Sequence, residues 1–107
     1  MDNKILDLSV FKQYTFDITF PDGSLLKVKK PTQAIVIEMV ALSQLDQNKQ
    51  AAVLEGLIDI CAAILSNNTE GKTYTAEWVA AELDIVMVSA IVKGYSAFIQ
   101  EIQNDPF

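Results

Sequence analysis

The chain has 107 residues, half of them apolar, and a formal net charge of −6. This length predicts a single domain, residues 1–107, with a core of its own, and the apolar content excludes an intrinsically disordered chain. All eight basic residues are lysines, and the sequence contains no histidine or arginine. These absences argue against nucleic-acid binding, which needs a basic stripe and favours arginine. They also remove the commonest general base and metal ligand.

The sequence shows no sign of export or of membrane insertion. Cys61 is the one cysteine, so an intrachain disulfide is impossible and a reducing compartment is favoured, with a covalent dimer through Cys61 as the alternative. The first residues lack the apolar block of a signal peptide. The apolar stretches 34–42 and 85–92 fall well short of the ~20 residues that cross a bilayer. We therefore expect a cytoplasmic protein without a membrane partner.

The first elements in chain order are a lead segment and a hairpin. Residues 1–13 are interpreted as an N-terminal lead, either a short helix or an extended strip laid on the domain. Residues 14–20 alternate between aromatic or aliphatic and polar side chains, which is typical of a strand. The turn residues of the segment 21–24 follow, and the chain returns through residues 25–30. The segment 14–30 is therefore predicted to be a β-hairpin whose apolar face is covered by helices.

Four helices are predicted after the hairpin, within the helical part 32–104. Their expected ranges are 33–45, 50–66, 76–83 and 85–103, and the residues expected to cap the first, third and fourth helices are Thr32, Thr75 and Asp84. On the last helix an apolar stripe recurs at helical spacing: Val88, Ile91, Tyr95, Phe98 and Ile102. The predicted fold class is α+β, an N-terminal β-hairpin followed by about four helices packed as a small helical domain.

The helix predicted at 33–45 is apolar on two sides. One stripe contains Ile35, Met39, Leu42 and Leu45. The other side carries Val36, Ile37 and Val40. A helix of this kind is either buried on both sides or open to a partner on one of them. The stripe of the last helix is similarly widened by Val92 and Ile99. These five residues, Val36, Ile37, Val40, Val92 and Ile99, are the predicted partner-binding residues.

The sequence offers no catalytic, cofactor-binding or metal-binding set. Cys61 lies on the apolar face of the second helix, where a buried, inert thiol is the better interpretation. The acidic residues fall on polar faces or caps, and no glycine-rich phosphate loop is present. Gly56 and Gly94 lie inside helices, which indicates either a tolerated imperfection or a close helix approach within the fold or across a subunit boundary. Asn67 begins a glycosylation pattern that indicates only an exposed loop.

The order of motifs resembles the small tail assembly chaperones of long-tailed bacteriophages, particularly those of Gram-positive hosts, including prophages. Three segments carry the resemblance: Tyr-Thr-Phe-Asp-Ile-Thr-Phe-Pro-Asp-Gly at 14–23, Leu-Lys-Val-Lys-Lys-Pro-Thr at 26–32, and Tyr-Thr-Ala-Glu-Trp-Val at 74–79. The segment Leu83-Asp84-Ile85 and the terminal helix extend the similarity over nearly the whole chain.

The resemblance implies a non-enzymatic role in viral assembly. Proteins of this family keep the apolar, helical tape-measure protein soluble while tail-tube subunits polymerise around it, and they are absent from the mature virion. The implied partners are the tape-measure protein and the tail-tube protein, and self-association is a competing use of the same surface. Many members also exist in a longer, frameshifted form, and this chain would match the shorter one. Alternatives are a small mobile-element regulator or inhibitor of a bacterial target, or a minor virion structural protein.

Overall fold

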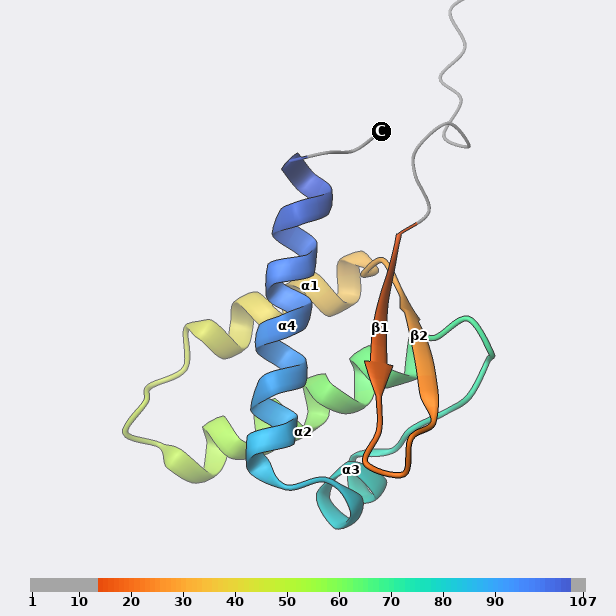
Figure 1. Ribbon diagram of the computed structural model, residues 1–107. Helices are drawn as coiled ribbons and strands as arrows, with labels where there is room; N and C mark the ends of the chain where they lie inside the picture. Colours follow the sequence, from red (N-terminus) through yellow and green to blue (C-terminus); the bar gives the residue numbers. More distant parts are fainter. Residues whose placement is uncertain (1–13, 105–107) are drawn as a thin grey trace, which may run out of the picture.

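The computed structural model of this protein describes residues 14–104, which form a two-stranded hairpin followed by four helices (Figure 1). This arrangement confirms the predicted α+β class. The interpretation of residues 1–13 as a lead segment lies outside the described residues. The elements in chain order are β1 (Thr15–Thr19), β2 (Leu25–Lys29), α1 (Gln33–Ser43), α2 (Gln50–Ser66), α3 (Ala76–Glu82) and α4 (Ile85–Asn104).

The hairpin is antiparallel, and its register places the apolar side chains of both strands on one face. Phe16 lies opposite Val28, and Ile18 lies opposite Leu26. Opposed residues in an antiparallel pair point to the same side of the sheet, so these four side chains form one apolar surface. Leu26 and Val28 are buried, which confirms that the apolar face of the hairpin is covered.

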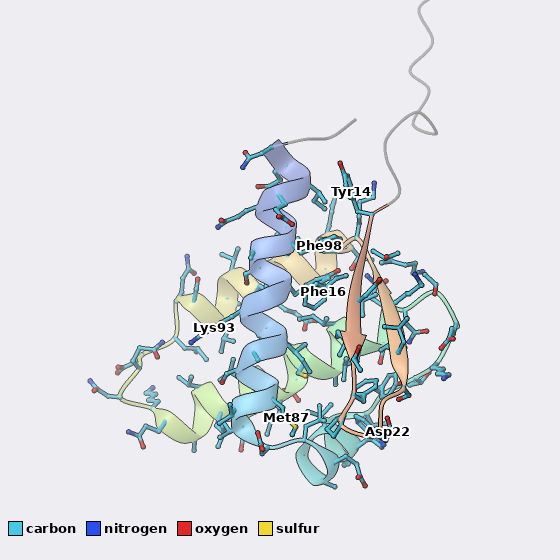
Figure 2. The ribbon with its side chains drawn as sticks, in the orientation of Figure 1. Tyr14, Phe16, Asp22, Met87, Lys93 and Phe98 are labelled. Atoms are coloured by element: carbon cyan, nitrogen blue, oxygen red, sulfur yellow. The ribbon has the colours of Figure 1, made fainter. Side chains whose placement is uncertain are left out.

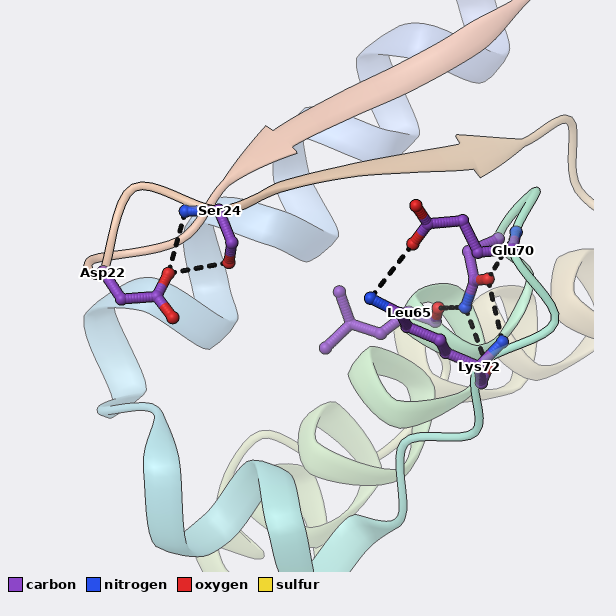
Figure 3. Close-up of polar contacts among 6 residues, drawn as sticks. Asp22, Ser24, Leu65, Glu70 and Lys72 are labelled. Carbon is purple, nitrogen blue, oxygen red and sulfur yellow. Dashed lines mark hydrogen bonds and ion pairs between the residues drawn. The ribbon is translucent and has the colours of Figure 1, made fainter.

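The hairpin turn is stabilised by the carboxylate of Asp22. Its Oδ1 accepts hydrogen bonds from the backbone N–H of Ser24 at 2.9 Å and from the Ser24 hydroxyl at 2.6 Å (Figure 3). These bonds favour the charged form and hold the pKa of the Asp22 carboxyl below its ordinary value. Gly23 has a φ of 89°, a left-handed conformation that side chains resist. Asp22 and Gly23 therefore stabilise the turn that was predicted at residues 21–24.

Side-chain caps define where three of the helices begin. The hydroxyl of Thr32 accepts from the N–H of Ile35 at 3.3 Å, and that of Thr75 accepts from the N–H of Trp78 at 3.0 Å. The Asp84 carboxylate accepts from the N–H of Met87 at 2.8 Å. These bonds satisfy donors that a helix start leaves free, and they confirm the three predicted caps.

The predicted end of α1 was two residues too late. Gln44 caps the helix, and the N–H of Leu45 bonds to the Leu42 carbonyl, three residues back, at 3.1 Å. The Asp46 side chain then accepts from the N–H of Asn48 at 2.9 Å, a local bond that competes with a continuing helix. The ends of α2, α3 and α4 agree with the predictions to within one residue.

The loop after α2 is exposed over residues 69–73, as expected, but its first residues, Asn67 and Asn68, are held against the rest of the fold. The Asn67 amide donates to the Lys30 carbonyl at 2.9 Å. Asn68 is buried, and its Nδ2 donates to the carbonyls of Leu65 and Lys72, both at 2.8 Å. Its Oδ1 accepts from two backbone N–H groups of the same loop (Figure 3). A buried amide with all these partners fixes the shape of the loop, while the Asn67 amide attaches the loop to the end of β2.

The two helix glycines both mark close approaches. A Cβ added at Gly56 would lie 2.7 Å from Cδ1 of Leu42, which is the predicted helix–helix approach, here between α2 and α1. A Cβ at Gly94 would lie 2.9 Å from Cζ of Phe16. That neighbour belongs to β1, so the expectation of a helix approach was wrong at Gly94. Because Gly94 has no side chain, the hairpin can instead pack closely against α4.

Replacing each glycine by alanine should change the free energy of unfolding differently at the two sites. At Gly94 the Phe16 ring is confined by Tyr95 and Phe98, at centroid distances of 5.6 and 5.7 Å, so the added methyl overpacks the core. We expect Gly94→Ala to lower the free energy of unfolding by about 1–3 kcal/mol in urea titrations. Gly56→Ala is the matched control, because the flexible end of Leu42 can move and helix propensity improves by up to about 1 kcal/mol. Equal stability of the two variants would contradict this account.

Tyr95 joins α4 to the end of β2. Its side chain is fully buried, and its hydroxyl donates to the Lys29 carbonyl at 2.6 Å. Burial raises the pKa of Tyr95 to about 12, and a hydrogen bond involving Asn67 opposes that shift. The ring also meets Phe16 edge-on. One residue therefore stabilises the contact between the last helix and both strands.

Tyr95→Phe should lower stability at neutral pH by about 1 kcal/mol, because the Lys29 carbonyl loses its short hydrogen bond and keeps only the one from the Asn67 amide at 3.4 Å. In the natural chain, unfolded Tyr95 ionises near pH 10 whereas folded Tyr95 ionises near pH 12. The unfolded state thus binds fewer protons between these values, and stability falls as the pH rises. The variant should lose this part of the slope. It should keep the part that begins near pH 9 and comes from Cys61, because burial raises the pKa of that thiol from 9.0 to about 11. Tyr74→Phe is the control, since the Tyr74 hydroxyl has no hydrogen-bond partner within residues 14–104. A slope unchanged in Tyr95→Phe would contradict the assignment.

Candidate binding surface

Among the predicted partner-binding residues, those on the outward side of α1 are the most exposed. Ile37 is 67% exposed and Val40 is 51% exposed, while Val36 is half-buried. The opposite side of the helix contains buried Ile35 and the half-buried Met39 and Leu42, which pack against the core. The two-sided pattern of α1 therefore corresponds to one inward face and one outward apolar face.

The outward face continues into a shallow groove between α1 and α2. The groove has a volume of about 410 Å³, and its lining includes Ala41, Leu45 and Gly56. Glu38 and Asp59 lie along the same groove and are both exposed. We call the set Ile37, Val40, Leu45, Glu38 and Asp59 the α1 surface. It combines exposed apolar side chains with two carboxylates at their margin.

The structure does not bring all five predicted partner-binding residues together. Val92 is half-buried and lines a separate groove of about 310 Å³ between α1, α2 and α4, with Met39 and Val53 among its neighbours. Ile99 is half-buried and packs against the core. Only Ile37 and Val40 present most of their surface to solvent. Val92 and Ile99 widen the inward face of α4, because α2 and the hairpin approach that helix from different sides.

A second apolar surface, which the sequence reasoning missed, lies between the hairpin and α4. It is a groove of about 550 Å³ lined by Phe16, Ile18 and Phe20 from one side and by Leu83, Met87 and Ile91 from the other. Figure 2 shows Phe16 on β1 and Met87 on α4. We call it the hairpin groove.

A sequence signal for the hairpin groove exists in the first turn of α4. Four consecutive apolar residues, 85–88, span more than one face of a helix, so they cannot all be buried on one side. Val88 is buried and Met87 lines the hairpin groove, whereas Ile85 and Val86, 46% and 73% exposed, line a separate groove on α4. Such a run at a helix start indicates an apolar face left outside the core.

The remaining reactive groups of the described chain have structural roles. Cys61 is fully buried, and desolvation raises the pKa of its thiol to about 11, so the reactive thiolate is scarce at neutral pH. Trp78 is half-buried and packs against Tyr74 at a centroid distance of 4.9 Å. Within residues 14–104, no group of three His, Cys, Asp or Glu side chains could hold a metal ion.

By length and composition alone, α4 could cross a membrane. Its most apolar window has a mean hydropathy of 1.4. The sequence analysis considered only the stretch 85–92 and therefore underestimated the length of the apolar segment. The core helix of a soluble protein passes the same test, and Val88, Ile91, Tyr95 and Phe98 of α4 lie in the core. A single helix of this kind is weak evidence for a membrane span.

Comparison with known proteins gives no relative from which a function can be transferred. No protein family, curated protein or solved structure matches this chain. The functional argument therefore depends on the surfaces described above and on the motif resemblance.

The thiol of Cys61 should resist modification while the chain is folded. With 5,5′-dithiobis(2-nitrobenzoate) at pH 8, we expect the thiol to react at least tenfold more slowly in buffer than in 6 M guanidinium chloride. The physical reason is the combination of full burial and a raised pKa, both of which are lost on unfolding. Rapid reaction of the folded chain, or a disulfide-linked dimer under native conditions, would contradict a buried thiol.

Proposed function

We propose that this protein is a non-enzymatic phage tail assembly chaperone that binds an apolar helical segment of the tape-measure protein. It acts in the cytoplasm of the bacterial host, helps tail-tube assembly and is absent from the mature virion. The observation that carries the proposal is the outward apolar face of α1, with Ile37 67% and Val40 51% exposed. The resemblance to tail assembly chaperones supplies the identity of the partner.

The α1 surface suits a helical ligand. An amphipathic helix binds by laying apolar residues at i, i+3 and i+4 spacing into an apolar groove. Ile37, Val40 and Ala41 repeat at this spacing on α1, and the groove beside α2 extends the contact towards Leu45. A partner helix can therefore pack alongside α1 without any rearrangement of the core.

The charges around this surface indicate what the partner carries. Glu38 and Asp59 line the groove, and the described part of α1 contains no lysine. Complementary charge raises association rates and fixes the orientation of the bound helix. We therefore expect the bound segment to combine an apolar stripe with flanking lysine or arginine residues. The net charge of −6 also keeps a chain with exposed apolar side chains soluble.

A pull-down tests this function. The chain is co-expressed with the tape-measure protein that this proposal expects to be encoded next to it, and the amount of soluble complex is measured. Ile37→Lys combined with Val40→Lys should reduce the complex at least tenfold, because two ammonium groups replace the apolar contact. Both side chains already face solvent, so the thermal midpoint should change by only a few degrees.

Leu25→Lys is the matched control for the α1 variant. Leu25 is 52% exposed on the hairpin, so this change places a lysine at a similarly exposed apolar residue away from α1, with one added charge where the α1 variant adds two. It should leave the complex intact. If neither variant affects the complex, the α1 surface is not the binding site. If no complex forms with the natural chain, or if mass spectrometry finds the chain in purified virions, the chaperone function itself is wrong.

A further inference from the structure

A further hollow adjoins the hairpin groove, between the hairpin turn and α3. It has a volume of about 420 Å³ and lies beside Asp22 at the turn (Figure 2). Phe20, Pro21 and Leu83 line both this hollow and the hairpin groove, so the two are continuous. The other residues of its lining are Asp22, Ser24, Tyr74, Trp78 and Glu82. We call it the aromatic hollow.

Three half-buried rings form a corner of this hollow. The ring centroids of Tyr74 and Trp78 lie 4.9 Å apart, and Phe20 lies 6.1 Å from each of them. The plane of Trp78 is inclined by 69° to Tyr74 and by 78° to Phe20. Rings at such angles do not form a closed stack, and each contributes surface to the lining. Aromatic surfaces attract cations, and tryptophan attracts them most strongly.

The charged groups that line the aromatic hollow are all negative. Asp22 and Glu82 are both exposed carboxylates, and no lysine of the described chain belongs to the lining. Lys27 and Lys72, the lysines nearest to the lining in sequence, are paired with other carboxylates at 3.7 and 3.1 Å. Glu82 has no ion pair within residues 14–104. The hollow therefore combines aromatic surface with two carboxylates, and both attract a cation.

Local hydrogen bonds hold the segments that carry the three rings. The Ser66 hydroxyl donates to the Tyr74 carbonyl and accepts from the Tyr74 N–H, both at 2.9 Å. The Thr75 cap accepts from the N–H of Trp78 at 3.0 Å, and the N–H of Phe20 donates across the hairpin turn at 2.8 Å. Side chains that are already positioned lose less conformational entropy on binding, so the hollow is suited to a ligand as it stands.

We propose that the aromatic hollow binds an arginine side chain of a partner protein, and that apolar residues beside this arginine enter the hairpin groove. The guanidinium group is planar and weakly hydrated, so it can lie against aromatic rings while its N–H groups bond to carboxylates. The lysine ammonium is more strongly hydrated and makes no planar contact. The continuity of the two hollows through Phe20 and Leu83 places an apolar neighbour of the arginine in the hairpin groove.

A second copy of the chain cannot supply the arginine, because the 107-residue sequence contains none. The ligand therefore belongs to a different protein. This site is also distinct from the α1 surface, since no residue of α1 lines the aromatic hollow. The proposal does not depend on the proposed function, and its tests need only the purified chain and synthetic peptides.

Peptide titrations of the natural chain, followed by NMR, are the first test. The probe is acetyl-Val-Arg-Val-amide, and the reporter is the indole N–H resonance of Trp78, the one tryptophan of the chain. This peptide should bind about fivefold more tightly than its citrulline analogue, which keeps the shape of arginine without the charge. Equal affinity for the two peptides, or no shift of the Trp78 resonance with either, would overturn the proposal.

Two further probes test the chemistry of the ligand. Acetyl-Val-Lys-Val-amide should bind about twofold more weakly than the arginine peptide, because ammonium is harder to dehydrate. Equal affinity would overturn the choice of arginine and would make a second copy a possible ligand. Acetylarginine amide, which lacks the valines, should bind about threefold more weakly because it leaves the hairpin groove empty. Equal affinity there would overturn the part assigned to that groove.

Glu82→Gln distinguishes binding in the aromatic hollow from binding elsewhere on an acidic chain. It should weaken the affinity for acetyl-Val-Arg-Val-amide about threefold, because a charge-assisted contact with the guanidinium group is lost. Glu77→Gln is the matched control: it removes the same charge from an exposed residue of the same helix that does not line the hollow. The control should bind the peptide like the natural chain, and both variants should keep the stability of surface substitutions. Equal weakening in the two variants, or no weakening in Glu82→Gln, would contradict binding in this hollow.

Discussion

The contact between Tyr95 and the end of β2 holds the two parts of this fold together. A two-stranded hairpin is barely stable by itself, so it depends on being packed against helices. Tyr95 supplies this packing twice, with its ring against Phe16 and its hydroxyl bonded to the Lys29 carbonyl. Gly94 lets Phe16 approach α4 at the adjacent position. The position of α4 relative to β1 therefore fixes the width of the hairpin groove.

Much of the architecture could be predicted because local signals agree with one another. The alternation at 14–20, the caps at Thr32, Thr75 and Asp84, and the stripe on α4 each specify one element, and each is found in the structure. The end of α1 was less predictable, because apolar Leu45 continues the stripe while the Asp46 side chain favours a turn. Local competition of this kind cannot be resolved from periodicity alone.

The candidate site was only partly predictable, because a wide apolar stripe does not say which neighbour covers it. Ile37 and Val92 look alike in sequence, yet Ile37 faces solvent and Val92 lines a groove between three helices. The difference arises from where α2 and β1 lie, which is tertiary information. The hairpin groove was missed for the same reason. Its two walls are separated by more than 60 residues in the sequence, and only the fold brings them together.

The two apolar surfaces have different chemical characters, and this difference argues for different occupants. The hairpin groove runs beside the outer edge of β1, whose outward backbone groups have no hydrogen-bond partner within residues 14–104, so it suits an extended ligand that adds a strand to the sheet. The α1 surface has no open backbone edge, since α1 satisfies its own hydrogen bonds, and it suits a ligand that does the same, a helix. The acidic margin of Glu38 and Asp59 also distinguishes the α1 surface from a general apolar patch, because it favours a helix of opposite charge.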